Sequence, residues 1–333
     1  MKEALVGPGP KVEIVDSPIP KPNADQILIK VVVSGSNPKD WKVPNFRKDT
    51  TNQGDDIAGI VEEVGSNVTE FKPGDRVAAL HEVLNPVGGS YAEYAISYDH
   101  AAFHLPQKTT FEEGSTIPLA ALTAVVGLYS TLGLPQPWLP ATEPTPLVVY
   151  SAASAVGAFA VQLARKSNIH PIIAVAGKSQ AFVETLIDRS KGDTIIDYRI
   201  GDEAVVEALK KALGESKLLY AFDAVSEHGS YVNLSKVLAQ GSKLALVLPA
   251  GNFEFPSYIT ASTFNLGPIH KNQKDLGFVY SRFFTRGLQE GWLKAHPQEI
   301  VPGGLGGIQK ALEDLQAGKA NAIKYVFRIA DTK

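Results

Sequence analysis

The sequence contains no cysteine in 333 residues. This absence excludes disulfide bonds, iron–sulfur clusters, thiolate zinc sites and a cysteine nucleophile. It also shows no apolar run of membrane-spanning length and no leader-like stretch at its start, so we expect a cytoplasmic protein without a membrane partner. Lys and Arg number 32 against 35 Asp and Glu. Without an excess of positive charge, no nucleic-acid partner is expected.

The chain shows two different patterns of predicted secondary structure. Up to about residue 120, β-branched runs at 27–33 and 57–64 alternate with Gly, Pro and Asn, which is typical of a small β-barrel or sandwich. After Ala120, apolar strands alternate with helical periods, which indicates right-handed crossovers and an open parallel sheet. The fold class is therefore α/β, with a doubly wound parallel sheet in its second half.

The alternating pattern after Ala120 predicts individual strands and helices. Strands are expected at 147–151, 172–176, 194–197, 218–223 and 243–248, and helices at 156–166, 180–190, 203–213 and 231–239. The proline-rich stretch 134–146 cannot be helical and is expected to be an exposed connection. The tail after about residue 268 contains two more helices, 275–290 and 308–317, and a strand at 324–329, and it could return to complete the first domain.

The strand at 147–150 leads through the turn SAASAVG (151–157) directly into a helix. Ala152, Ser154 and Gly157 occupy the three glycine positions of the G-x-G-x-x-G template, and only the third is glycine. Small side chains still allow a pyrophosphate to approach the helix N-terminus, so Ser154, Ala155, Val156 and Gly157 are predicted cofactor contacts. A non-binding α/β domain with a small-residue turn is the alternative.

The choice of nicotinamide cofactor depends on the end of the second strand. NAD-binding folds usually carry a carboxylate about 20 residues after the glycine turn, but here Gly177, Lys178 and Ser179 stand there. An ammonium and a hydroxyl match a 2′-phosphate, and Tyr198 could add a donor, so NADPH is predicted. Lys178 as a merely solvated loop residue is the alternative. Two further residues are assigned to the cofactor site, Leu248 and Leu266.

Several ordered segments resemble the medium-chain dehydrogenase/reductase superfamily. They are GDDIAGIVEEVGSNV (54–68), FKPGDRV (71–77), NPKDWK (37–42), GGSYAEY (88–94), LAALTA (119–124) and the stretch 197–199. The resemblance covers nearly the whole chain. It implies a chaperonin-10-like β-barrel catalytic domain at 1–120, completed by 268–333, and a Rossmann NADP-binding domain at 121–267.

The zinc-dependent branch of that superfamily has Gly-His-Glu where this chain has Gly54, Asp55 and Asp56. Among the histidines, only His100 and His104 have a ligand-like spacing, and they flank a strand-like stretch for which a structural role is expected. No metal site is therefore predicted. The chain instead resembles the zinc-independent quinone oxidoreductases and enoyl reductases. The proline-rich insertion and FNLGP (264–268) look like the fungal trans-acting enoyl reductases.

The resemblance implies NADPH-dependent reduction of a carbon–carbon double bond conjugated to a carbonyl. Lys42 and Thr123 fall on positions that lie beside the nicotinamide in the resembled reductases, and Asn37 is expected near them. Whether Lys42 stabilises the enolate, organises the site or is only a surface lysine paired with Asp40 is left open. The substrate is an enone, an enoyl thioester or a quinone, either free or presented by a carrier protein or synthase. Quinone reduction and a non-catalytic NADP-binding role remain alternatives, as do monomer and homodimer.

Overall fold

The computed structural model describes all residues from 1 to 333, and contacts within the chain divide it into two compact units. The first unit comprises Met1–Leu122 and Leu266–Lys333, so the tail is part of the same unit as the N-terminal strands. The second unit comprises Thr123–Asn265. That the first unit is catalytic and the second binds the cofactor stays a prediction.

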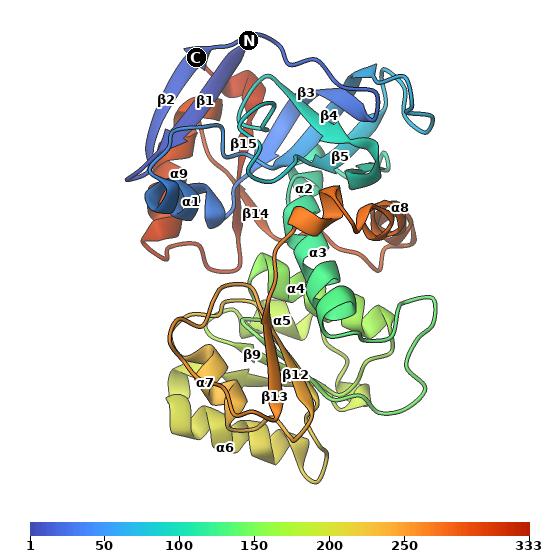
Figure 1. Ribbon diagram of the computed structural model, residues 1–333, viewed down its shortest axis with the longest axis vertical. Coiled ribbons are helices and arrows are strands. Elements are labelled where there is room, and N and C mark those ends of the chain that lie inside the picture. Colours follow the sequence, from blue (N-terminus) through green and yellow to red (C-terminus); the bar gives the residue numbers. More distant parts are fainter. The chain divides into compact units, whose positions relative to one another are not determined.

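The second unit contains a six-stranded sheet in which all neighbouring strands are parallel, in the order β10-β9-β8-β11-β12-β13. Strands β9, β12 and β13 are labelled in Figure 1. The strands are β8 (Leu147–Tyr150), β9 (Ile172–Ala176), β10 (Thr194–Asp197), β11 (Tyr220–Asp223), β12 (Ser242–Leu246) and β13 (Ile259–Thr263). This is the doubly wound order, in which the winding direction reverses between β8 and β11. Ligands of such sheets bind beyond the carboxyl ends of the strands at this reversal.

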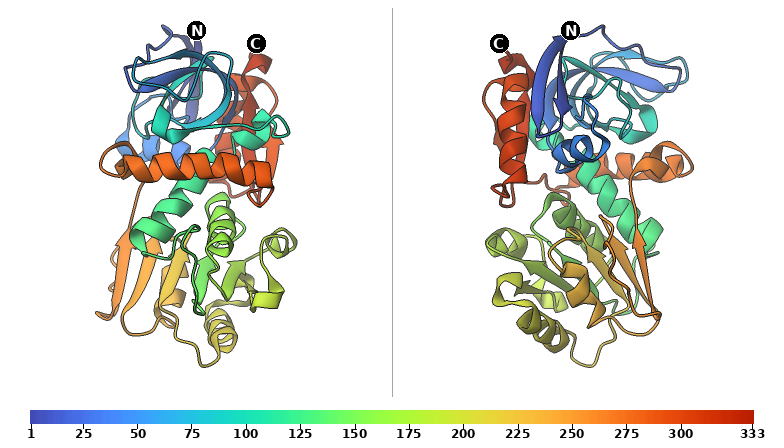
Figure 2. Two further views of the ribbon diagram at one scale, coloured as in Figure 1. Left: turned by 90° about the vertical axis from the view of Figure 1, so that its right-hand side faces the viewer. Right: turned by 60° about the vertical axis from the view of Figure 1, so that its left-hand side comes forward.

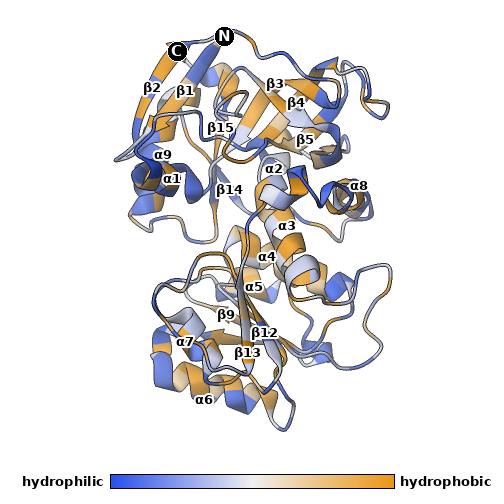
Figure 3. Cartoon of the chain, viewed as in Figure 1, coloured by the Kyte–Doolittle hydropathy of each residue, from blue (hydrophilic) through white to orange (hydrophobic).

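Helices connect these strands. They are α4 (Ala155–Lys166), α5 (Gln180–Glu184), α6 (Asp202–Leu213) and α7 (Ser230–Ser235), with shorter turns η3 (Arg189–Lys191) and η4 (Tyr198–Ile200). In α6 the buried residues are Val205, Val206, Leu209 and Leu213, which recur on one side of the helix, while charged residues cover the other (Figure 3). Right-handed crossovers require the helices on the two sides of the reversal to lie on opposite faces of the sheet.

The first unit contains a seven-stranded sheet and a separate hairpin of β1 (Lys2–Gly7) and β2 (Lys11–Asp16). The sheet strands are β3 (Gln26–Gly35), β4 (Asp56–Val64), β5 (Arg76–Leu80), β6 (Tyr94–Tyr98), β7 (Ala102–His104), β14 (Gln298–Ile300) and β15 (Lys324–Arg328). One half of β3 pairs with β6 and the other half pairs with β15, so a strand from the tail completes this sheet. The GroES-like fold class is confirmed by the family comparison below.

Helices and turns of the first unit border the sheet. They are α1 (Lys39–Arg47), α2 (Phe111–Gly114), α8 (Lys274–Glu290), α9 (Ile308–Gln316), η1 (Asp99–Ala101), η5 (Gly267–His270), η6 (Gly304–Gly307) and η7 (Ile329–Asp331). The side chain of Gln309 on α9 accepts a hydrogen bond from the backbone N–H of Val12, so this helix lies along the β1–β2 hairpin (Figure 2).

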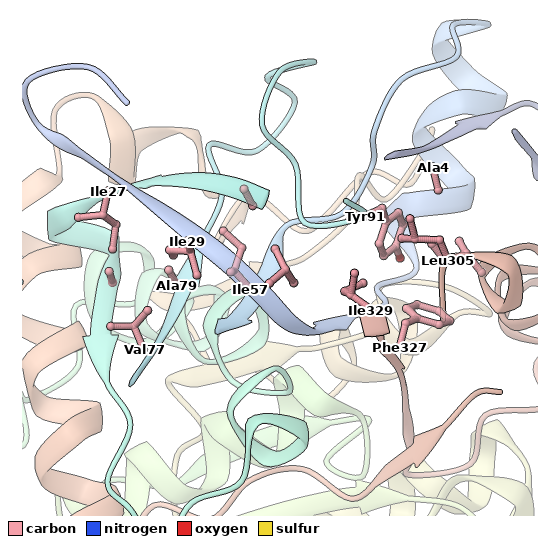
Figure 4. Packing of buried hydrophobic residues seen from close by; sticks show 14 of the residues in the cluster. Ala4, Ile27, Ile29, Ile57, Val77, Ala79, Tyr91, Leu305, Phe327 and Ile329 are labelled. Atoms are coloured by element: carbon pink, nitrogen blue, oxygen red, sulfur yellow. The ribbon is translucent and has the colours of Figure 1, made fainter. Parts of the chain in front are cut away.

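A single apolar core joins the beginning and the end of the chain in this unit. Alternate residues of β3, namely Ile27, Ile29 and Val31, point into it, as the two-residue period of a strand requires. Tyr91, Leu305 and other residues complete the core; the set labelled in Figure 4 is Ala4, Ile27, Ile29, Ile57, Val77, Ala79, Tyr91, Leu305, Phe327 and Ile329. Burial of these side chains is what fixes the tail against the N-terminal strands.

Three elements differ from the sequence prediction. The predicted helix at 180–190 ends at Glu184, because Asp188 turns the chain by accepting a hydrogen bond from the Ser190 N–H and starts η3. The predicted helix at 231–239 is shortened to α7. Strand β13 was not predicted, since its sequence ITAST has no apolar run and its strand conformation depends on parallel pairing with β12.

One helical segment is long and apolar enough to pass a length-and-composition test for a membrane span. By length and composition alone, Phe111–Thr131 passes that test; it contains α2, α3 (Pro118–Val125) and the π-helical turn η2 (Val126–Thr131). Of its most apolar window, 78% is buried inside the structure, as in the core helix of a globular protein.

Candidate functional site

The turn between β8 and α4 has the local geometry of a phosphate-binding turn. Ser151 adopts a positive φ of 62°, and Ser154 caps α4 by accepting a hydrogen bond from the Gly157 N–H at 3.1 Å. The N–H groups of Ala155 and Val156 lie in the first helical turn, where no intrahelical acceptor exists. These two donors and the positive end of the helix dipole are therefore what this turn can offer to a pyrophosphate.

Gly157 is required by packing. A Cβ atom at this position would lie 2.2 Å from the Ser151 carbonyl oxygen and 2.8 Å from the Ala152 Cα. Any side chain would push α4 away from the end of β8. The residues present therefore fit a dinucleotide cofactor: a short turn, two open N–H donors and a close helix–strand approach.

The second part of the predicted cofactor site lies at the end of β9. Gly177 lies against the ring of Tyr198, since a Cβ on this glycine would meet the Tyr198 ring at 2.6 Å and its hydroxyl oxygen at 2.8 Å. The side chain of Lys178 is exposed and that of Ser179 is half-buried. The structure thus places Tyr198 next to Gly177, although Tyr198 begins η4 and directly follows β10, the next strand along the chain.

The nearest carboxylate in this region is already paired. Asp197, at the end of β10, lies 2.6 Å from the Arg199 guanidinium and accepts a hydrogen bond from Gln180 at 2.9 Å. These hydrogen bonds lower the pKa of Asp197 to about 2. No carboxylate directly follows β9, where an NAD-specific fold would present one to the ribose.

The remaining predicted cofactor and substrate contacts are distributed over both units. Leu248 is half-buried just after β12 in the second unit, whereas Leu266 is buried and begins the second segment of the first unit. Thr123 is the first residue of the second unit, and Asn37 and Lys42 belong to the first. Their grouping into one site stays a prediction.

Asn37 takes part in a buried polar network of the first unit. Its amide donates to Asp56 at 2.7 Å and accepts from the Lys324 ammonium at 3.1 Å. Lys324 also forms an ion pair with Asp56 at 2.5 Å, and the other Asp56 oxygen accepts from the Leu119 N–H at the start of α3 at 2.7 Å. Asn37 is thus held in one orientation by a carboxylate and an ammonium.

A second charged cluster lies beside it, around the start of α1. The Lys39 ammonium lies 2.7 Å from an Asp55 oxygen and 3.2 Å from an Asp40 oxygen, and it donates to the Gln53 carbonyl at 2.7 Å. The other Asp40 oxygen accepts from the Tyr91 hydroxyl at 2.6 Å. Both carboxylates are buried.

The electrostatics of this cluster follow from burial and pairing. Burial raises the pKa of Asp40 to about 6, although the Lys39 charge opposes the shift. For Asp55, burial acts in the same direction, but Lys39 and His81 outweigh it and lower the pKa. Burial alone would lower the pKa of Lys39, and the carboxylates of Asp55 and Asp40 raise it instead. The cluster therefore favours a protonated lysine facing two carboxyl groups.

Lys42 lies three residues further along α1. Its side chain is half-buried, and its ammonium lies 5.5 Å from the centre of the Trp41 ring. Asp40, the partner considered for it from the sequence, contacts Lys39 and Tyr91. The predicted role of Lys42 beside the nicotinamide stays a prediction.

Sequence reasoning missed the roles of Lys39, Tyr91 and Lys324. Lys39 and Tyr91 lie inside the quoted motifs, and the lysine directly before Asp40 in NPKDWK (37–42) is a signal from which an ion pair could have been predicted. Lys324 carries no local signal, since its partner Asp56 is 268 positions away.

The two histidines considered as metal ligands have structural partners. His104 lies 3.2 Å from Asp75 and stacks on Phe71, with ring centres 4.6 Å apart. His100 stacks on Tyr98, with ring centres 5.2 Å apart. The chain has no group of three or more His, Asp or Glu side chains arranged to hold a metal ion. That the protein needs no zinc stays a prediction.

Two other buried histidines make the stability of the protein depend on pH. His270 and His296 are only 7% and 2% exposed. Burial is the main cause that lowers the pKa of His270 to about 4 and that of His296 to about 3. In the unfolded chain both take up a proton near pH ~6.5.

Acidification from pH 7 to 5 is therefore expected to destabilise the protein. Below pH ~6.5 the unfolded chain binds a proton on each of these histidines that the folded chain does not, so each lowers the free energy of unfolding by about 1.4 kcal/mol per pH unit. Protonation of Asp40 in the folded chain, with its pKa of about 6, offsets part of this loss near pH 5. Urea unfolding at several pH values measures this slope. His296→Asn should make it shallower, whereas His104→Asn, at a half-exposed position, should not; equal slopes in all three proteins would contradict the assignment.

Comparison with known proteins identifies the family. Residues 23–107 match the alcohol dehydrogenase GroES-like domain. The trans-enoyl reductase fsr4 of Gibberella fujikuroi is 53% identical over 309 residues, which cover 91% of both chains. The chain therefore belongs to the trans-enoyl reductase family of the medium-chain dehydrogenase/reductase superfamily.

Solved structures show the same fold at lower identity. A putative zinc-dependent alcohol dehydrogenase from Rhizobium etli matches with a TM-score of 0.84 and 22% identity, covering 98% of both chains. The CurK enoyl reductase matches with a TM-score of 0.77 and 22% identity, also covering 98% of both chains. At these identities the structural similarity establishes only the shared fold. The cofactor of the medium-chain dehydrogenase/reductase family is a nicotinamide nucleotide.

Proposed function

We propose that this protein is an NADPH-dependent enoyl reductase that reduces a double bond conjugated to a carbonyl, without zinc. The observation that carries the proposal is the 53% identity to a trans-enoyl reductase along 91% of the chain. It is supported by the turn at the doubly wound reversal, where the first N–H groups of α4 have no intrahelical acceptor. The substrate is a small enone or an enoyl thioester, either free or attached to a synthase or its carrier domain.

In this proposal, named residues bind the cofactor and others act on the substrate. Ala155 and Val156 would bind the pyrophosphate through their N–H groups, and Lys178, Ser179 and Tyr198 would bind the 2′-phosphate. The cofactor, when bound, supplies a hydride to the β-carbon of the substrate. Lys42 would hold the negative charge that develops on the carbonyl oxygen, and Thr123 would hold the nicotinamide carboxamide.

Zinc chemistry is not supported by the residues at the corresponding place. Asp55, which stands where the zinc-dependent branch has histidine, is paired with the Lys39 ammonium and with His81. A conjugated double bond is already electrophilic, so its reduction needs a hydrogen-bond donor for the enolate but no Lewis acid.

A panel of substrates tests the proposal. NADPH oxidation should be seen with 2-enoyl thioesters or enones, should persist after exhaustive chelation, and should be absent in the reverse assay with ethanol or benzyl alcohol. Faster turnover of quinones than of every enone would favour a quinone reductase. NADPH binding without turnover of any acceptor would favour a non-catalytic role, and EDTA-sensitive activity restored by stoichiometric zinc would overturn the zinc-free reading.

NADPH is expected to bind at least about tenfold more tightly than NADH, a difference of ~1.4 kcal/mol that one charge-assisted contact can supply. The reason is the Lys178–Ser179 segment beside Tyr198 and the absence of a carboxylate directly after β9. Fluorescence titration of both cofactors measures the ratio. Lys178→Ala should reduce it, and Lys191→Ala, an exposed lysine in η3, serves as the control; a ratio unchanged in Lys178→Ala would contradict the assignment.

A further inference from the structure

The Lys39 ammonium faces two buried carboxylate oxygens, one of Asp40 and one of Asp55. Its side chain is 18% exposed, while those of Asp40 and Asp55 are 0% and 2% exposed. The Asp40 and Asp55 oxygens that face Lys39 accept no hydrogen bond from any other group. Without the ammonium, both oxygens would be buried and uncompensated, which is among the costliest arrangements in a protein interior.

Lys39 also connects two separate parts of the first unit. It is the first residue of α1, and Asp40 belongs to the same helical turn. Its other partners, Gln53 and Asp55, lie in the segment that enters β4. Asp40 attaches the same turn to the core through the Tyr91 hydroxyl. The start of α1 is therefore tied to the sheet by buried polar contacts, and Lys39 makes the contact to β4.

His81 contacts the other oxygen of Asp55 and therefore does not replace Lys39. Its Nδ1 lies 3.1 Å from Asp55 Oδ1 and its Nε2 lies 2.9 Å from the Val87 carbonyl oxygen. Lys39 instead faces Asp55 Oδ2 and Asp40 Oδ1. Removal of Lys39 would leave these two buried oxygens without a cation.

Lys42 follows Lys39 by three positions on α1, so the two residues lie on the same side of the helix. We propose that Lys39 is a positioning residue: its ammonium is an internal cation that ties the first turn of α1 to the β4 segment and thereby orients Lys42 for the reaction. This inference rests on the proposed function for the role of Lys42, while the link between α1 and β4 can be measured without it.

The first test is Lys39→Ala, which removes the cation and leaves space for a small amine. We expect kcat to fall at least about tenfold, as for a displaced catalytic group, with the affinity for NADPH unchanged. Ethylammonium chloride should restore part of the activity, whereas propanol and sodium chloride at equal concentration should not. Restoration by propanol or by salt, or no loss of activity at all, would overturn the proposal.

The second test uses pH. The titratable groups that face the Asp40–Asp55 pair are Lys39, His81 and Tyr91. His270 is near enough for Asp55 to affect its pKa, but with a pKa of about 4 it is neutral between pH 6 and 8. Without Lys39 the two carboxyl groups disfavour each other's ionisation, so one takes up a proton more readily. The kcat of Lys39→Ala should therefore fall as the pH rises from 6 to 8, because ionisation leaves an unpaired charge. A profile parallel to that of the wild type would contradict the inference.

The third test separates positioning from stability. Lys39→Ala combined with Asp55→Asn removes one charge of each sign, so the double variant should unfold at a urea concentration near that of the wild type. Its kcat should stay low and should not respond to ethylammonium, since the link to β4 is lost. If kcat recovers together with stability, Lys39 has only a structural role.

Hydrogen exchange of residues 39–47 gives a readout independent of turnover. Protection of these amides should drop in Lys39→Ala and recover with ethylammonium. If the wild type reduces no acceptor while this protection responds as expected, the proposed function fails and the link between α1 and β4 stands. Unchanged protection would overturn the inference whether or not the protein is active.

Discussion

Replacing Gly157 by alanine is expected to abolish cofactor binding and to destabilise the second unit. The added Cβ would lie 2.2 Å from the Ser151 carbonyl oxygen, a distance that no relaxation of a side chain can relieve because both contacting atoms belong to the backbone. Either α4 moves away from β8 or the turn changes conformation. Both outcomes displace the N–H groups of Ala155 and Val156 from the phosphate position.

The expected magnitudes follow from these two effects. Overpacking against backbone costs about 1–3 kcal/mol or more of stability, and loss of the pyrophosphate contacts should weaken NADPH binding at least about a hundredfold, or ~2.7 kcal/mol. Fluorescence titration and urea unfolding measure the two quantities. Gly306→Ala is the control, because a Cβ there has no atom within 4 Å and its φ is not in the left-handed region. NADPH affinity within threefold of the wild type would show that this turn does not bind the cofactor.

Lys42→Met is expected to lower kcat about a hundredfold, which corresponds to the loss of one preorganised donor to a developing oxyanion. The cofactor should still bind with its normal affinity, since Lys42 belongs to the first unit and the phosphate-binding turn to the second. Methionine keeps the length and the apolar stem of lysine, so contact with Trp41 can be retained. Stopped-flow NADPH oxidation with the best substrate of the panel measures the change.

Arg47→Met is the matched control for Lys42. Arg47 is a cation at the end of the same helix, and its side chain is exposed. If Lys42→Met and Arg47→Met have similar kcat values, Lys42 is only a surface lysine, which is one of the alternatives left open by the sequence. A normal kcat with a raised KM would instead assign it to substrate binding, since only interactions made in the transition state change kcat.

Several features were predictable because their causes are local. The turn at 151–157 combines a buried strand, a serine cap and a glycine within about ten residues, so strand, turn and helix follow from neighbouring positions. The same holds for α6, whose apolar residues recur on one side. The family resemblance was confirmed by the identity to a trans-enoyl reductase.

Other features were decided by partners that are distant in the sequence. Strand β13 exists because β12 offers it a parallel edge. Tyr198 lies against Gly177 only because β9 and β10 pair side by side. None of these contacts leaves a periodic signal in its own segment.

The sequence by itself determined the class of the protein, the doubly wound unit with its serine-capped turn at 151–157, and the absence of thiolate ligands. Only the tertiary structure decided that Lys39 faces Asp55 and that Lys324 faces Asp56. The physical reason is that a helix cap or a glycine turn is stabilised within a few residues, whereas a buried charge needs a partner of opposite sign. The register of β3, β4 and β15 selects that partner from anywhere in the chain.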